Sequence, residues 1–341
     1  MKAFLQRKGI EPGVHNYLIQ ALSYMALGLF SSLIIGLIMQ TIGDAGVQAG
    51  FPTGWLSEIG ETAMSLAGSA IGAAVAYGLK APRLVLFAGL FSGALGYELA
   101  GPAGSFLAAL FSTEIGKLVS QETKVDIIVT PFVTILAGAL ASYTVGPPIS
   151  GALTQLGAFI IWATEQQPFV MGVIIAVTMG AALTAPISSA AIAIILQLDG
   201  LAAGAATVGC AAHMIGFAVS SYRENKGAGL MALGLGTSML QIANVIKNPR
   251  ILVPPTVAAA ILGPFATMFF LMENNPEGAG MGTSGLVGQI MTVNTMGTGG
   301  EVFAGIILLH FAAPAVISLI VSEWMRKKDW IRPGDMQIDK S

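Results

Sequence analysis

The sequence predicts an all-α polytopic membrane protein of about ten transmembrane helices, in two like-oriented repeats plus re-entrant segments, with both termini cytoplasmic. Three observations lead to this fold class. Hydrophobic residues make up 54% of the 341 residues and charged residues only 10%, whereas about a quarter of a soluble domain is charged. The apolar runs approach about 20 residues and lack the strict alternation of outer-membrane strands. The third observation is the placement of the basic residues.

All sixteen Lys and Arg residues fall on one side of a membrane in a single threading of the apolar stretches. Segments that contain acidic but no basic residues separate the basic clusters. Because cytoplasmic loops are enriched in Lys and Arg, this alternation predicts both a topology and an orientation. The clusters are Lys2, Arg7 and Lys8; Lys80 and Arg83; Lys117 and Lys124; Arg223 and Lys226; Lys247 and Arg250; and Arg326, Lys327, Lys328, Arg332 and Lys340.

The threading places the elements of a single membrane domain, residues 1–341, in order. The first helix is expected at 16–42, because its apolar run is too long for the core of a signal peptide. The expected order after it is repeat 1 at 62–146, with helices at 62–79, 84–98, 101–119 and 125–145; an outer amphipathic connector at 147–168; repeat 2 at 169–272, with helices at 169–184, 186–197, 200–221 and 251–271; a Gly-rich outer loop at 273–300; the last helix at 302–325; and a cytoplasmic tail at 326–341.

Residues 228–246 are apolar enough to cross the membrane, yet basic residues flank them at both ends. The charge rule therefore favours a re-entrant segment that returns to the cytoplasmic side. If this segment crosses instead, every later element is inverted and the basic tail lies outside.

Two stretches of the chain resemble two later ones. Residues 127–133 (IIVTPFV) align with 251–257 (ILVPPTV), and Gly72-Ala73-Ala74 leading to Ala81-Pro82 aligns with Gly180-Ala181-Ala182 leading to Ala185-Pro186. In the threading both copies run in the same direction, as in repeats related by an axis along the membrane normal. Chance similarity between Ala- and Gly-rich helices is the alternative.

Proline and glycine mark four places where a membrane helix could break: residues 101–104, 184–189, 234–244 and 278–288. Transporters bind their substrates at such breaks near the bilayer midplane. Hydroxyl and amide side chains are neutral donors and acceptors, suited to a polyol or another uncharged polar solute. Close helix packing and turn formation are the alternative at each break. The candidate solute-binding residues are Ser188, Ser189, Thr237, Ser238, Gln241, Asn244, Thr283 and Ser284.

Two ionisable residues complete the candidate site. A charge inside the bilayer costs at least about 2.5 kcal/mol, so a retained ionisable group is expected to be paired or solvated. His213 lies in the middle of an apolar helix, where it either fixes helix packing through a hydrogen bond or contacts a substrate or proton. Glu114 lies one turn from Lys117, so a local ion pair is its first explanation and a role in the site the second.

The residue inventory argues against enzyme chemistry. The run GAGMGTSGLVG lacks the Lys of a phosphate-binding P-loop. Three histidines far apart in sequence indicate neither a zinc site nor a hydrolase triad, and the single Cys210 excludes disulfides and thiolate clusters. We therefore expect no catalytic residue, metal, cofactor or nucleic-acid partner.

Seven motifs, in order, are GPAGSFLAAL, GKLVSQETKVDIIVTP, GPPI, LTAPISSAAIAI, GLAAGAATVGCAAHMIGFAV, GLGTSMLQIANVIKNPRILVPPT and NNPEGAGMGTSGLVG. With them the chain resembles the stand-alone membrane (EIIC) subunits of the phosphotransferase system (PTS), the group that includes the perfringolysin regulatory protein. The resemblance runs from about residue 10 to the last helix. It implies a multi-pass sugar-permease-like protein of the bacterial plasma membrane, and a homodimer.

In a working phosphotransferase system the IIC subunit binds the sugar, while IIA and IIB domains carry the phosphoryl group. Only sixteen residues precede Tyr17 and eleven follow Trp330, so we expect no such domain in this sequence and expect phosphoryl transfer to need a IIB-like partner on the basic cytoplasmic face. Characterised sugar-transporting relatives use a Glu and a His at the sugar, and Glu114 and His213 are matched to these by residue type only.

The leading hypothesis is transport of a sugar or polyol by alternating access between the two repeats. A membrane sensor or regulator without transport, and an ion-coupled secondary transporter, are the alternatives.

Overall fold

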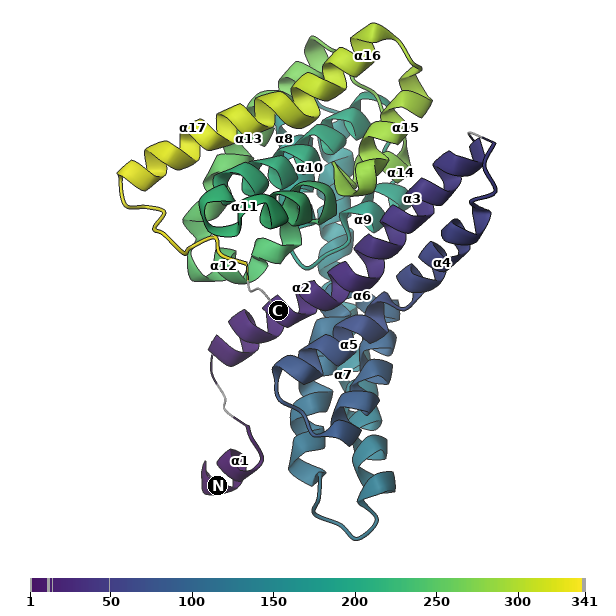
Figure 1. Cartoon of the computed structure of the whole chain (residues 1–341), viewed down its shortest axis with the longest axis vertical. Coiled ribbons are helices and arrows are strands. Elements are labelled where there is room, and N and C mark those ends of the chain that lie inside the picture. Colours follow the sequence, from purple (N-terminus) through teal and green to yellow (C-terminus); the bar gives the residue numbers. More distant parts are fainter. Residues whose placement is uncertain (1, 11–12, 14, 49, 339–341) are drawn as a thin grey trace. The chain divides into compact units, whose positions relative to one another are not determined.

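The computed structural model describes residues 2–10, 13, 15–48 and 50–338 of the chain. Helices make up 82% of it, and no strand occurs in these residues, which confirms the predicted all-α class (Figure 1). The chain divides into two compact units, Met1–Ala152 and Leu153–Ser341. Residues 339–341 of the predicted tail, among them Lys340, lie outside the described part of the chain.

The first unit begins with the short helix α1 (Lys2–Arg7) and a long helical stretch that covers the first helix expected at 16–42. The stretch contains α2 (Ala21–Leu29) and α3 (Ile35–Gln48), with the π-helical turn η1 (His15–Gln20) before α2 and η2 (Phe30–Ile34) before α3.

The helices α4 (Gly54–Ser65) and α5 (Ala67–Gly78) return along this stretch, bent by 51° relative to each other. α4 packs against α3, and α5 packs against α2. A Cβ atom on Gly36 would lie 2.7 Å from the carbonyl oxygen of Gly60. Glycine therefore permits the close approach of α3 and α4, as small residues do between membrane helices.

The helix α6 (Arg83–Val119) folds back on itself as a hairpin. Ala100 and Gly101 have non-helical backbone angles, with φ at +60° for Gly101. A Cβ on Gly96 would lie 2.7 Å from the Cβ of Ala108, whereas a straight helix would separate two such residues by about 18 Å. The two arms thus pack face to face, and the break predicted at Gly101-Pro102 is confirmed.

The helix α7 (Asp126–Thr164) is 39 residues long and contains Pro131, Pro147 and Pro148. The connector expected at 147–168 is therefore not a separate element over most of its length, because residues 147–164 are part of α7. Neighbouring groups can satisfy the carbonyls that an internal proline frees, so membrane helices tolerate proline. The boundary between the two units falls inside this helix.

In the second unit, α10 (Gly200–Ser220) is the central helix. Its most apolar window is 89% buried, and it packs against α8 (Pro168–Thr184), α13 (Val253–Met268) and α17 (Ala313–Lys327). A Cβ on Gly209 would lie only 2.0 Å from the carbonyl oxygen of Ala176. Glycine is thus required where α10 crosses α8.

Shorter elements surround these helices. They are α9 (Ser189–Ile195), α11 (Tyr222–Met231), η3 (Ala232–Gly236), η4 (Ser238–Gln241), α12 (Ile242–Lys247), η5 (Pro249–Leu252), α14 (Pro276–Ala279), η6 (Ser284–Leu286), α15 (Val287–Met296), α16 (Gly300–Gly305) and η7 (Ile306–Ala312).

Six helices of the described residues are long and apolar enough to cross a membrane, or seven if α4 and α5 count as one bent span. The protein is thus a multi-pass membrane protein, and the expected number of ten is not confirmed. Part of the difference is that α6 holds two of the expected spans. Another part is length: α8 has 17 residues, and the span expected at 186–197 is reduced to the seven residues of α9, whereas a full crossing needs about 20.

Candidate functional site

Two broken segments of the second unit interrupt the regular helices. In the first, the π-helical turn η3 ends at Gly236 and is followed by Thr237, whose backbone is extended (φ −158°, ψ 143°), before η4 begins. In the second, Gly282 and Gly285 both have φ of +54°. Glycine adopts this left-handed conformation without a steric penalty. Both breaks were predicted from sequence, within residues 234–244 and 278–288.

The two segments meet beside α10. The hydroxyl of Thr283 donates to the carbonyl oxygen of Gly234, and its Oγ1 also lies 3.5 Å from Sδ of Met214 in α10. A Cβ on Gly282 would lie 2.7 Å from the backbone N of Ala211, so this turn rests directly on α10. This meeting point, residues 282–284 against Gly234 and α10, is called the junction below.

His213 of α10 belongs to a buried hydrogen-bonded chain of three side chains. Oγ1 of Thr184 lies 2.9 Å from Nδ1 of His213 and 2.9 Å from Oγ of Ser238. Thr184 ends α8 and Ser238 begins η4, so the chain links three elements. All three side chains are at most 2% exposed.

Buried polar atoms of the site residues are left without partners. Nε2 of His213 and Oγ of Ser284 are both buried, and neither has a hydrogen-bond partner among the described residues. Such an atom costs about 1–3 kcal/mol when nothing satisfies it. A polar ligand that formed a hydrogen bond with either atom would remove this cost, and its binding would be favoured accordingly.

The five remaining candidates of the second unit are engaged within the protein. Ser188 caps α9 by accepting the backbone N–H of Ala191, and Ser189 donates to the carbonyl oxygen of Gly280 at 2.7 Å. Gln241 and Asn244 donate to the backbone carbonyls of Met336 and Gln337 in the C-terminal segment. Thr237 accepts the backbone N–H of Met239. None of these five contacts reaches His213.

Glu114 lies in the first unit and forms an ion pair. Its Oε1 lies 2.9 Å from Nζ of Lys117, whose side chain is only 2% exposed and which also donates to the carbonyl oxygen of Gly9. Both charges line a polar pocket of about 80 Å³ together with Tyr17, which is room for a few water molecules. The ion pair that the sequence suggested first is present.

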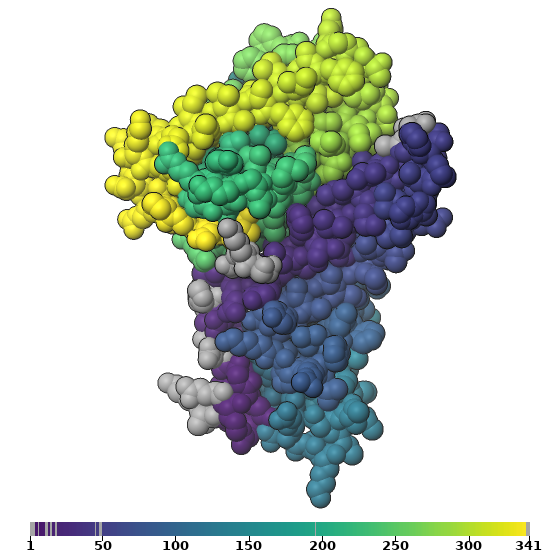
Figure 2. Space-filling model, viewed as in Figure 1, coloured from purple at the N-terminus to yellow at the C-terminus, as the bar shows by residue number. Residues whose placement is uncertain are grey.

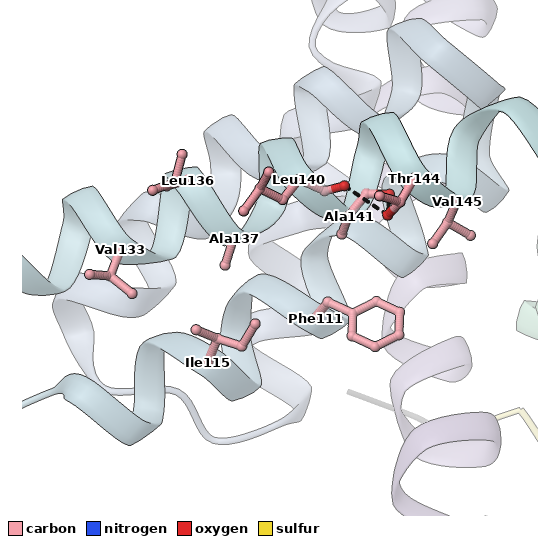
Figure 3. A pocket seen from close by; sticks show the side chains of 9 residues that line it. All are labelled: Phe111, Ile115, Val133, Leu136, Ala137, Leu140, Ala141, Thr144 and Val145. Atoms are coloured by element: carbon pink, nitrogen blue, oxygen red, sulfur yellow. Dashed lines mark hydrogen bonds between the residues drawn. The ribbon is translucent and has the colours of Figure 1, made fainter.

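A second pocket of the first unit is apolar. It has a volume of about 370 Å³ between α6 and α7, and Figure 3 shows Phe111 and Ile115 on one side and the α7 side chains on the other. The hydroxyl of Thr144 is bonded to carbonyl oxygens of its own helix. This groove therefore suits hydrocarbon and not a polar solute.

Three polar residues next to the junction were not predicted as site residues: Thr184, Gln289 and His310. All are buried. Their common signal is a polar side chain inside an otherwise apolar stretch, which in a membrane protein indicates a paired or functional group. Among the described residues, no three His, Cys, Asp or Glu side chains gather as metal ligands would.

The broken helices and the buried polar junction define a multi-pass membrane protein of the transporter class. The family model described as phosphotransferase system, EIIC, matches residues 19–338. The chain belongs to this family, as its motifs predicted, and the family supports a sugar-transporting permease that typically works with IIA and IIB partners. None of the curated proteins matches the sequence.

Proposed function

We propose that the protein carries a sugar or polyol across the bacterial plasma membrane by alternating access, and that the solute binds at the junction. His213, Ser238, Thr283 and Ser284 are the residues of the original prediction that belong to this site, and Thr184 joins them. The proposal thus assigns a solute-binding site to a chain that belongs to the EIIC family.

The single observation that carries the proposal is the free ring nitrogen of His213. Thr184 bonds to Nδ1 of the imidazole and is itself bonded to Ser238, while Nε2 is buried without a partner among the described residues. An imidazole used only for packing would be expected to satisfy both nitrogens, because an unpaired buried polar group is destabilising. A solute hydroxyl can donate to or accept from Nε2, depending on the tautomer.

The proposed binding mode uses neutral groups. The polar side chains assigned to the proposed site are four hydroxyls and one imidazole, all buried, and such groups discriminate by hydrogen bonds and not by charge. The glycines of the two breaks permit backbone rearrangement at the same place. These features suit an uncharged solute with several hydroxyl groups.

Further parts of the proposal concern topology and partners. The alternation of basic clusters supports cytoplasmic termini, and the family supports a cytoplasmic IIB-like partner. We include a homodimer in the proposal on the same family grounds. The two like-oriented repeats are the proposed source of the alternating access.

Equilibrium binding in lipid nanodiscs tests the site. The ligands are a panel of hexoses and hexitols, and the variants are His213→Phe and Ser238→Ala. We expect at least one ligand to bind, and each variant to weaken it by about tenfold or more, the effect of losing one hydrogen bond to a buried partner.

Ser112→Ala is the matched control, because Ser112 is equally buried and, among the described residues, its side chain bonds only to the carbonyl oxygen of Ala109 in its own helix. Wild-type affinity in the His213→Phe protein would overturn the location. Binding without transport would favour a membrane sensor.

A further inference from the structure

Gln289 and His310 form a buried pair beside the junction. Gln289 lies in α15 and His310 in the π-helical turn η7, with exposed fractions of 8% and 1%. Nε2 of Gln289 lies 2.9 Å from Nδ1 of His310 and 3.2 Å from the carbonyl oxygen of Gly282. Gly282 belongs to the junction, so the pair is directly connected to it.

The hydrogen bonds of the pair fix which atoms carry protons. A backbone carbonyl can only accept, so the side-chain amide of Gln289 must turn its NH₂ group toward Gly282. The same NH₂ group faces Nδ1 of His310, which must therefore accept. In a neutral imidazole the proton then resides on Nε2.

This assignment leaves one donor and one acceptor unused. The Nε2–H of His310 and the Oε1 of Gln289 are both buried, and neither has a partner among the described residues. The apolar cluster next to them includes Leu309 and Ile306 of η7 and Val208 of α10. In such surroundings an unpaired donor and an unpaired acceptor are both destabilising, and a polar ligand would satisfy them.

The backbone provides a second observation. π-helical turns are rare and are frequently found at functional sites. The described part of the second unit contains two, η3 and η7. One supplies Gly234, which accepts from Thr283, and the other supplies His310, which accepts from Gln289. Both turns thus contact the short stretch 283–289.

We propose that Gln289 and His310 form a hydroxyl-binding subsite of the solute site. A solute hydroxyl accepts from Nε2–H of His310, and a hydroxyl of the same solute donates to Oε1 of Gln289. The inference rests on the proposed function, because it assigns these atoms to the same solute.

Two conservative variants separate binding from packing. In His310→Asn, the side-chain oxygen can still accept from Gln289, but the Nε2–H donor is gone. In His310→Gln, an N–H donor is restored near the position of Nε2. Thr292→Val is the control, because Thr292 is a buried residue of α15 that bonds to Gly288 and Asn274.

The measurement is equilibrium binding of hexoses and hexitols, each intact and in its monodeoxy forms. We expect the wild type to bind one intact ligand about tenfold more tightly than one of its monodeoxy forms. His310→Asn should lose this discrimination and keep it at the other hydroxyl positions, while His310→Gln restores part of it and Thr292→Val retains all of it.

The outcomes separate the two claims. Undiminished discrimination in His310→Asn overturns the subsite and leaves the proposed function standing. Absence of binding by the wild type to the whole panel overturns both. If His310→Asn does not fold, as judged by size-exclusion chromatography, Gln289→Met provides the same comparison, since it removes Oε1 with little change in volume.

Discussion

Nε2 of Gln241 donates a hydrogen bond to the backbone carbonyl of Met336 at 2.8 Å, across 95 residues of sequence. Asn225 donates to the same carbonyl and accepts the backbone N–H of Ile338, and Asn244 donates to the carbonyl of Gln337. The C-terminal segment is therefore held on the broken segment that contains η3 and η4, and Figure 2 shows it beside α11. Met336 and Ile331 are at most 1% exposed.

We expect Gln241→Leu to loosen this C-terminal segment. The change removes one of the two donors to Met336 and leaves Asn244 without its acceptor on Gln241, which costs about 1–3 kcal/mol locally. Cleavage by endoproteinase Asp-N between Gly334 and Asp335 should accelerate several-fold. Gln166→Leu is the control, because Gln166 lies just beyond α7 and its side chain bonds, among the described residues, to the carbonyl oxygen of Trp162. Equal cleavage rates would show that Gln241 does not hold the segment.

Glu114→Gln should lower stability, because it leaves the buried ammonium of Lys117 without its counter-charge. Loss of one partner of a buried ion pair costs about 3–5 kcal/mol. The double variant Glu114→Gln, Lys117→Met should recover most of this loss, as measured by thermal unfolding. Solute affinity should stay at the wild-type level in the double variant. A large loss of affinity would indicate that Glu114 does take part in solute binding.

Glu122 should make stability depend on pH at the N-terminus. Hydrogen bonding to Lys8, and the charges of Lys8 and Arg7, lower the pKa of Glu122. A lowered pKa stabilises the fold above the unfolded-state pKa, and this contribution disappears as pH falls through the folded-state pKa.

The difference in melting temperature between wild type and Glu122→Gln should therefore be present at neutral pH and vanish in acid. It should also shrink at high salt, since the pair is exposed. A difference that is constant with pH would contradict this explanation.

Gly209→Ala should strongly destabilise the second unit. Its Cβ would lie 2.0 Å from the carbonyl oxygen of Ala176, so α8 and α10 would have to separate, at a cost of about 1–3 kcal/mol or more. Gly151→Ala is the matched control, because nothing lies within 4 Å of its Cβ position. It should be neutral or slightly stabilising in a helix. Similar unfolding temperatures for the two variants would contradict the close packing.

The sequence predicted the structure best where neighbouring residues alone determine the backbone conformation. Gly101-Pro102 predicted the turn of the α6 hairpin, because only glycine adopts φ of +60° easily there. The breaks near Thr237 and Gly282 and the place of His213 inside an apolar helix were also predicted. Pro147 and Pro148 were misleading, because tertiary contacts in a membrane protein can sustain a helix through proline.

The partners of the polar side chains could not be predicted in the same way. Gln241 and Asn244 were assigned to the solute, and they bind the C-terminal segment instead. An amide side chain has donors and acceptors for either role, and the choice depends on a contact 95 residues away. Gln289 and His310 were missed as a pair for the same reason.

Uptake into liposomes tests the central claim most directly. Purified protein is reconstituted and given radiolabelled hexoses and hexitols, with and without the general phosphotransferase components, and His213→Phe is run in parallel. We expect saturable uptake or exchange of at least one sugar or polyol by the wild type, and a loss of about tenfold or more in His213→Phe. Absence of uptake across the whole panel under both conditions would contradict the proposed transport, and equal uptake by His213→Phe would contradict its site.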